Sequence, residues 1–599
     1  MKNIIFVIIC FALVSNSFSQ TGDANFNKIV KEYTLNNDGS IDYHETKSIE
    51  LLSHFAFHRL HGETFIIYNT DYQELKVNSS YTIMADGKKI TTPSNAYNEV
   101  LPRFSNNAPY YNNIREMVVT HTGLEVGSVI NLDYTIHTEA GFYPALFGDE
   151  LLNQSSPVNE LIIRVTIPEN KELNYKLLNE TGEPVVSSEK SNKVYTWSFK
   201  SLKATSKEYY QISDNSLLPR LVFSTLNPDQ AYNEFVSQSA FDYMTNETMS
   251  KVVSDIMNKE TDKLKVALEL QKVVSNNLGN INIPLEYTGF KCRNTIETWN
   301  SNQGTPLEKS ILLSALLKKA NIEAIPVAII PTEILTKDVG NLLSFNQFMV
   351  RVKIKKQGGI YLHPNKTDGH NQKYDMGGKA ILALDKELSK VKYEIPKPST
   401  KGIAIKARLE LQNTDKLLGE INLTLNKGAN PYLSIYQDSS KVKSMVTGIS
   451  GIKESQIKKL TQDECISVIS FKMDKPTTIQ GKYHTLTLPK ASGGVDSWHI
   501  NLLTADRDAP LEIPSLIEER YEYAIVLPAE AKMVSNPTFS IISNEAGSVT
   551  IQYEQKENEI IILKEIKLTK KIISPSYYSK FKDIMDVWNN KMFGEVVFK

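Results

Sequence analysis

Cysteine is scarce in this sequence: three residues among 599, at Cys10, Cys292 and Cys465. Cys10 lies in an apolar run at the N-terminus, and the other two fall in segments that the residue patterns assign to separate domains. A disulfide between Cys292 and Cys465 is therefore not expected, which argues against the disulfide-stabilised class of small secreted proteins. A large exported chain without disulfides favours a bacterial envelope over a eukaryotic exterior.

An excess of charge is also lacking. Lys and Arg number 67 against 68 Asp and Glu, which argues against a dedicated nucleic-acid-binding protein because such proteins carry a basic excess. Beyond the N-terminal run, no apolar stretch is long enough to span a bilayer. The composition, with 41% hydrophobic and 23% charged residues, is ordinary for a globular protein, and the length predicts three or four domains. We expect no nucleic-acid partner and no cofactor. We expect the protein to be a monomer.

The first 19 residues are typical of a secretory signal peptide. Lys2 supplies the positive flank, residues 4–14 form the apolar run, and Ser17 and Ser19 form a small-x-small cleavage site. The run is too short to cross a membrane. Because Cys10 lies in its middle rather than at the cleavage point, a lipid anchor is not expected. We expect an exported protein, soluble in the periplasm or outside the cell.

Residues 20–230 have the pattern of a β-rich domain. Apolar and polar side chains alternate over 129–136 and 160–168, and Asp86-Gly87 is a turn signal. This spacing of short strands predicts a β-sandwich-like domain.

Residues 231–394 change to a period of 3.6, beginning with a helical stripe over 264–278. The domain is organised around a later helix whose opening is Thr305, Pro306 and Glu308. These residues supply an N-cap hydroxyl, a proline at the first helical position and a capping box. Apolar residues wrap most of the helix that follows, so we expect it to lie inside the domain.

This opening resembles the nucleophile helix of the transglutaminase-like superfamily, relatives of the papain-fold cysteine proteases. In that pattern a glycine lies two residues before the catalytic cysteine, which opens a helix rich in leucine and alanine. Here Gly304, Thr305 and Pro306 occupy these places. The resemblance implies a papain-type α+β domain whose helix N-terminus would activate a thiolate. Pro306, however, offers no nucleophile.

Two later strands fit the family's histidine and aspartate positions. Residues 345–350 match the histidine strand with Gln347 in the histidine place, and residues 360–364 match the aspartate strand with His363 in the aspartate place. Acyl transfer of this kind needs a thiolate and a base within hydrogen-bond reach. The resemblance therefore implies a degenerate triad at Pro306, Gln347 and His363, and no catalytic residue.

Cys292 is the only thiol of the central domain and is the fallback nucleophile. It precedes Pro306 in a predicted loop with no helix N-terminus to activate it, so a half-buried loop cysteine is the favoured interpretation. Thr305 is a weaker substitute because its hydroxyl acts as the N-cap.

Two groups of histidines raise a metal hypothesis, since helical histidine pairs can bind zinc. They are His54, His58 and His61 with His44 upstream, and His363 with Asp368 and His370. In both segments incidental or solvated side chains are the favoured interpretation, and no metal is expected.

Residues 395–599 follow a proline-rich linker and are predicted to be mostly β, with a final helix from Pro575. No internal repeat stands out. Both β-rich regions resemble the uncharacterised modules that flank transglutaminase-like domains in exported bacterial proteins. The matching features are residues 123–130 before the central domain and 507–521 after it.

Three functions remain open. The chain could bind a peptide, glycan or protein partner in an emptied papain-type cleft, act as an enzyme through a displaced nucleophile such as Cys292, or serve in envelope assembly. Loss of the triad favours the non-catalytic functions, and nothing in the sequence separates binding from assembly.

Overall fold

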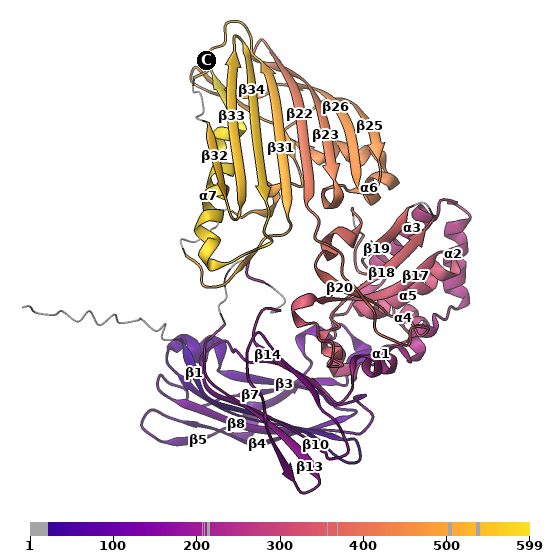
Figure 1. Ribbon diagram of the computed structural model, residues 1–599, viewed down its shortest axis with the longest axis vertical. Coiled ribbons are helices and arrows are strands. Elements are labelled where there is room, and N and C mark those ends of the chain that lie inside the picture. The colour runs from indigo at the N-terminus through magenta and orange to yellow at the C-terminus, as the bar shows by residue number, and fades with distance from the viewer. Residues whose placement is uncertain are drawn as a thin grey trace, which may run out of the picture.

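The structure is a computed structural model that describes residues 22–599, apart from 206–207, 209, 213–215, 356, 368, 501–505 and 535–538. A β-rich N-terminal domain, a central α+β domain and a β-rich C-terminal domain follow one another along the chain (Figure 1). The predicted multidomain α+β fold class is confirmed. The predicted signal peptide, residues 1–19, lies outside the described residues. Within the described part, no helix is long and apolar enough to cross a membrane.

The N-terminal domain is built on an eight-stranded sheet with the order β12-β13-β10-β1-β2-β8-β4-β5. Its strands are β1 (Ala24–Leu35), β2 (Ile41–Leu51), β4 (Gln73–Ile83), β5 (Lys89–Thr91), β8 (Val129–Thr138), β10 (Val158–Pro168), β12 (Val185–Glu189) and β13 (Asn192–Leu202). Apolar and polar side chains alternate along the strands, so one face of the sheet is apolar. Along β8, for example, every second side chain is buried.

Two smaller sheets cover that apolar face. One is β3 (Glu63–Asn69), β7 (Ile114–Thr120) and β6 (Tyr97–Val100), and the other is β11 (Asn174–Leu178), β14 (Arg220–Ser224) and β9 (Phe147–Leu151). Val119 of the first packs with Leu132 and Ile136, and Phe223 of the second packs with Ile163. The apolar faces of facing sheets meet, as in a β-sandwich.

The central domain is a five-stranded sheet, β19-β18-β17-β20-β21, with helices against it. The strands are β17 (Glu323–Pro331), β18 (Gln347–Ile354), β19 (Gly358–Leu362), β20 (Lys379–Ala383) and β21 (Tyr393–Glu394), and the helices are α1 (Pro228–Val236), α2 (Glu247–Met257), α3 (Lys263–Asn277), α4 (Thr295–Asn300) and α5 (Pro306–Lys319). Every residue of α5 from Leu307 to Leu317 is buried, so the predicted internal helix is confirmed. A short parallel pair, β15 (Gly279–Asn280) with β16 (Gln303–Gly304), brings the chain after α3 beside the start of α5.

The C-terminal domain is a second eight-stranded sheet, β25-β26-β23-β22-β31-β34-β33-β32. Its strands are β22 (Lys401–Gln412), β23 (Lys416–Asn426), β25 (Ile452–Leu460), β26 (Glu464–Asp474), β31 (Ile517–Val526), β32 (Ser540–Asn544), β33 (Gly547–Lys556) and β34 (Glu559–Leu568). Smaller elements lie beside it: α6 (Tyr432–Gln437), α7 (Tyr578–Trp588), β24 (Val446–Thr447) with β29 (Lys490–Ala491), β27 (Thr477–Gln480) with β28 (Tyr483–Thr487) and β36 (Glu595–Phe598), and β30 (Leu511–Glu512) with β35 (Ile572–Ile573).

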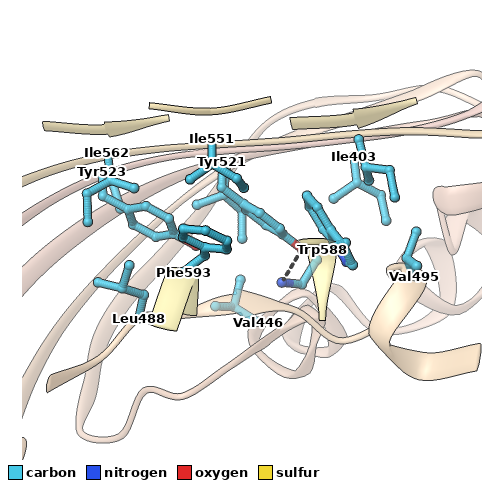
Figure 2. Packing of buried hydrophobic residues seen from close by; sticks show 14 of the residues in the cluster. Ile403, Val446, Leu488, Val495, Tyr521, Tyr523, Ile551, Ile562, Trp588 and Phe593 are labelled. Atoms are coloured by element: carbon cyan, nitrogen blue, oxygen red, sulfur yellow. Dashed lines mark hydrogen bonds between the residues drawn. The ribbon is translucent and has the colours of Figure 1, made fainter. Parts of the chain in front are cut away.

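One apolar core joins this sheet to the smaller elements. Figure 2 shows Tyr521 and Tyr523 pointing from the sheet toward Trp588 of α7 and Phe593. The rings of Tyr521 and Trp588 are stacked, with their centroids 6.0 Å apart. The predicted C-terminal helix is therefore part of the domain core, with Trp588 1% exposed.

The two large sheets share one strand order. Position by position, β4-β8-β2-β1-β10-β13-β12 corresponds to β25-β26-β23-β22-β31-β34-β33. Each neighbouring pair has the same direction in both sheets, including the one parallel pair at the centre, β1 with β10 and β22 with β31. The flanking domains thus repeat one topology, although no repeat was evident in the sequence.

Candidate functional site

The start of α5 is a closed capping box. Glu308 N–H donates to Thr305 Oγ1 at 3.2 Å, and Thr305 N–H donates to Glu308 Oε2 at 2.9 Å. Pro306 occupies the first helical position and has no N–H to offer. The predicted helix opening is confirmed, and the Thr305 hydroxyl already serves the helix as its cap acceptor.

A hollow of about 460 Å³ opens at this helix start. Its walls are mostly apolar side chains from the segment 281–290, from α5 and from the loop before β18. They are Ile283, Pro284, Leu285, Phe290, Pro306, Leu307, Leu342, Leu343, Phe345 and Phe348, joined by Asn282, Glu286, Thr305 and Asn346. The volume lies within the usual range of small-ligand sites. We call this hollow the α5 cleft.

Behind the cleft, Glu308 is held by an arginine and a tyrosine from two other segments. Arg293 binds both carboxylate oxygens, through Nε to Oε1 at 2.9 Å and through an Nη to Oε2 at 2.8 Å, and Tyr111 OH donates to Oε1 at 2.6 Å. Glu308 is 1% exposed. Burial opposes ionisation of this carboxyl, but the Arg293 guanidinium and its hydrogen bonds prevail and hold the pKa of Glu308 below its usual value.

Gly304 is required just before the cap. A Cβ at this position would lie 2.9 Å from Thr298 Cγ2 and 3.0 Å from Lys309 Cγ. Lys309 is itself fully buried and donates to the carbonyl of Leu278 at 3.0 Å and to Asn280 Oδ1 at 2.5 Å. Burial lowers the pKa of Lys309 to about 8. The first turn of α5 is therefore fixed by a glycine contact and a buried lysine as well as by the cap.

Neither Gln347 nor His363 lines the α5 cleft, although Asn346 and Phe348 on either side of Gln347 do. The side chain of Gln347 is exposed, and its oxygen accepts from Lys379 Nζ at 3.4 Å. His363 Nδ1 accepts the N–H of Asn365 at 3.0 Å. Burial and two nearby lysines lower the pKa of His363 to about 4, so its imidazole is neutral near pH 7. The lining thus includes Pro306 but not the other two triad positions.

Cys292 is a half-buried cysteine whose surroundings oppose loss of the thiol proton. Its N–H donates to Gln238 Oε1 at 3.0 Å, and its Sγ lies 3.7 Å from the same oxygen. Burial, followed by the Glu308 carboxylate, raises the pKa of the Cys292 thiol far above its usual value. A thiol so protonated lacks the thiolate that nucleophilic catalysis needs.

In the first predicted histidine group, His54 and His58 both contact the ring of Phe57, with ring centroids 5.3 and 4.6 Å apart. Ala56–Leu60 form a single π-helical turn, in which His58 is exposed, while His61 just beyond it is buried and packs edge-on against Phe26 at 5.4 Å. His44 lies on β2, where Glu32 and Asp133 bind its two ring nitrogens at 2.8 and 2.9 Å.

In the second group, His370 pairs with Asp375 at 2.7 Å, and Asp368 lies outside the described residues. Across the described part of the chain, no three His, Cys, Asp or Glu side chains form a group able to hold a metal.

A second hollow, of about 270 Å³, adjoins the α5 cleft on the side of the N-terminal sheet. Glu286, Phe290 and Leu343 line both hollows. The other walls come largely from the covered face of that sheet, including Tyr33 and Tyr43. The N-terminal domain therefore completes the site. A larger hollow of about 680 Å³ between loops of the N-terminal domain and α1 shares Phe290 and Leu342 with the α5 cleft but contains no residue of α5.

Sequence reasoning missed Tyr111, Glu286 and Arg293. Tyr111 and Arg293 are distant from each other in the chain, and no local sequence pattern predicts that both contact Glu308. Glu286 did carry a signal, because it is the sole charged residue in the otherwise apolar and polar segment 281–290. An isolated charge in such a segment is often functional or paired.

Comparisons with known proteins find family matches in both flanking regions. Residues 37–206 match a domain of unknown function with a solved structure, DUF3857, and residues 484–598 match another, DUF3858. The predicted flanking domains are thus similar to uncharacterised families, as expected. No curated protein matches the chain.

Among solved structures, a "putative protease" from Parabacteroides distasonis is 26% identical to this chain with a TM-score of 0.74. The match covers 96% of this chain and 99% of that protein, so the two share the whole three-domain architecture. An M1 zinc metallopeptidase from Deinococcus radiodurans matches 34% of this chain and 43% of its own length, at 12% identity and a TM-score of 0.18. A TM-score this low does not indicate a shared fold.

Proposed function

We propose that this chain is an exported, non-catalytic protein whose central domain is a transglutaminase-like domain that binds a peptide, glycan or protein partner in the α5 cleft. One observation carries the proposal: the helix start where that superfamily places its cysteine presents Pro306 to a hollow with apolar walls. The hollow supports binding, and the missing nucleophile argues against acyl transfer.

The competing function is peptide hydrolysis, which the name of the Parabacteroides protein suggests for that protein. In this chain it would need a displaced nucleophile such as Cys292. Burial and the neighbouring Glu308 oppose the thiolate of Cys292, and His363 lies off the cleft lining. At the same helix start, two positions offer no N–H to an oxyanion, because Pro306 lacks an N–H and that of Glu308 is already bound to Thr305.

The test is thiol labelling joined to activity assays on the mature chain. Iodoacetamide should label Cys292 slowly, and its rate should rise with pH because only the rare thiolate reacts. Acyl-transfer and peptide-hydrolysis assays should give no turnover. Rapid labelling that stays flat between about pH 6 and 8, together with activity that is lost in Cys292→Ser, would establish an enzyme instead.

Export is the second component of the proposal. The positive flank, apolar run and small-x-small site at residues 1–19 support it. Expression with the native N-terminus in a bacterium with an outer membrane should yield a periplasmic or released product that begins at or near Gln20. Mass spectrometry that found Met1 on the exported protein would contradict this part of the proposal.

A further inference from the structure

The α5 cleft and the hollow beside it are acidic. Glu286 is the one charged side chain in the lining of the cleft, and the adjoining hollow adds Glu150. No lysine, arginine or histidine belongs to either lining. An occupant that carries a positive charge would therefore meet carboxylates and no like charge.

The two carboxylates are not equivalent. Glu150 is neutralised inside the protein, since Lys31 Nζ lies 2.5 Å from its Oε2 and Tyr33 OH donates to its Oε1. Among the described residues, the Glu286 carboxylate accepts a hydrogen bond only from its own backbone N–H and has no ion pair, and its charge is felt by Tyr143 and Tyr287. Burial raises the pKa of Glu286 with no cation to oppose it. A half-buried carboxylate left in this state is unfavourable until a cation joins it.

The walls around Glu286 suit the rest of such an occupant. Tyr143, Tyr287 and Phe290 line the adjoining hollow, and aromatic faces attract ammonium and guanidinium groups. Leu285, Leu343 and several other apolar side chains cover the remainder. Besides Glu286, the side chains of the cleft lining that could hydrogen-bond a sugar are Asn282 and Asn346, because the Thr305 hydroxyl serves as the N-cap. Apolar walls with one uncompensated acid fit a peptide better than a glycan.

We propose that the α5 cleft binds a peptide that places a lysine or arginine side chain against Glu286 and packs apolar neighbours on Leu285, Phe290 and Leu343. This inference rests on the proposed binding function and adds the chemistry of the ligand. The basic group supplies the partner that Glu286 lacks, and the apolar neighbours fill the walls. The cavity shared by the N-terminal and central domains then acts as one site.

The test uses three fluorescent hexapeptides with blocked termini, identical except for a central lysine, norleucine or glutamate between leucines. Binding to the mature full chain is measured by fluorescence anisotropy. The lysine peptide should bind at least about tenfold more tightly than the norleucine peptide, and the glutamate peptide should bind weakest. Blocked termini leave the central side chain as the only variable charge.

Two variants test whether the preference for lysine depends on Glu286. Glu286→Gln should abolish the preference for lysine over norleucine. Glu234→Gln removes an exposed carboxylate from the larger hollow beside α1, so it matches the change in net charge and should keep the preference. Glu286→Gln should also melt at the same or a higher temperature than the parent, because it replaces an unpaired, partly buried charge.

The outcomes separate this inference from the proposed function. Equal binding of the lysine and norleucine peptides would overturn the role of Glu286 and leave peptide binding in the cleft intact. A preference that survives Glu286→Gln would equally overturn it. Failure of all three peptides to bind would overturn peptide binding itself. A preference lost only in Glu286→Gln would support the inference.

Discussion

The hydroxyl of Tyr111 donates a 2.6 Å hydrogen bond to Glu308, and this bond joins the N-terminal domain to the first turn of α5. Tyr111 lies just before β7, and Ala108 and Ile114 on either side of it pack with Ile281 and Ile283 of the segment that forms one wall of the cleft. The N-terminal domain therefore braces both the helix start and one wall of the α5 cleft. A site built in this way depends on the flanking domain for its shape.

The first prediction concerns this brace. Tyr111→Phe should lower the free energy of unfolding by about 1.5–3 kcal/mol, the usual worth of a hydrogen bond to a charged group. Glu308→Gln should cost more, about 3–5 kcal/mol, because it breaks a buried ion pair and leaves the Arg293 guanidinium without its counter-charge. Urea unfolding followed by intrinsic fluorescence checks both changes.

Tyr110→Phe is the matched control for Tyr111→Phe. Tyr110 is the neighbouring residue and is 57% exposed, so loss of its hydroxyl should change the unfolding free energy by less than about 0.5 kcal/mol. Equal effects of the two substitutions would show that the Tyr111–Glu308 bond adds nothing to stability.

The sequence predicted α5 well because the relevant signals are local. Thr305, Pro306 and Glu308 lie within four positions, and their capping geometry follows from backbone chemistry alone. Burial of the helix followed from its lack of a polar face. Similar local alternation predicted the flanking sheets, since a strand with one buried face repeats every two residues.

The second prediction tests the buried helix. Leu312→Ala or Leu316→Ala should cost about 2–5 kcal/mol, because each removes a fully buried side chain from a packed core. Thr305→Ala should cost about 0.5–2 kcal/mol through the lost N-cap bond. Lys319→Ala, an exposed change on the same helix, is the control. Melting temperatures that order the variants differently would argue against α5 as the main core element.

The sequence could not predict contacts between distant segments. Arg293 and Tyr111 are 15 and 197 positions from Glu308, and only the folded chain shows that all three meet. The repeated sheet topology was equally hidden, since strand order is set by long-range pairing rather than by a shared motif.

The last prediction concerns Lys564 in the C-terminal domain. Lys564 is 9% exposed, donates to the carbonyl of Trp588 at 2.8 Å and lies over the Trp588 ring at 4.1 Å. Burial lowers the pKa of Lys564 to about 8 despite nearby Asp496 and Glu519. In the unfolded chain a lysine has a pKa of about 10.4.

The sign of the pH effect follows from these two values. Between about pH 8 and 10.4 the unfolded chain holds a proton that the folded chain has released, so the free energy of unfolding rises with pH in this window. Below pH 8 both states are protonated, and the fold bears the full cost of a buried ammonium. The gain across the window is at most about 3 kcal/mol.

Denaturant unfolding at pH 7 and pH 9.5 measures this gain in the parent and in Lys564→Met. The parent should become more stable relative to Lys564→Met as the pH rises, because methionine fills the same space without a charge. Lys567→Met replaces an exposed lysine on the same strand and should show no such trend relative to the parent. The difference in unfolding free energy between the parent and Lys564→Met could instead stay constant from pH 7 to 9.5. Lys564 would then be charged in the folded protein throughout this range, and its pKa would not be lowered by burial.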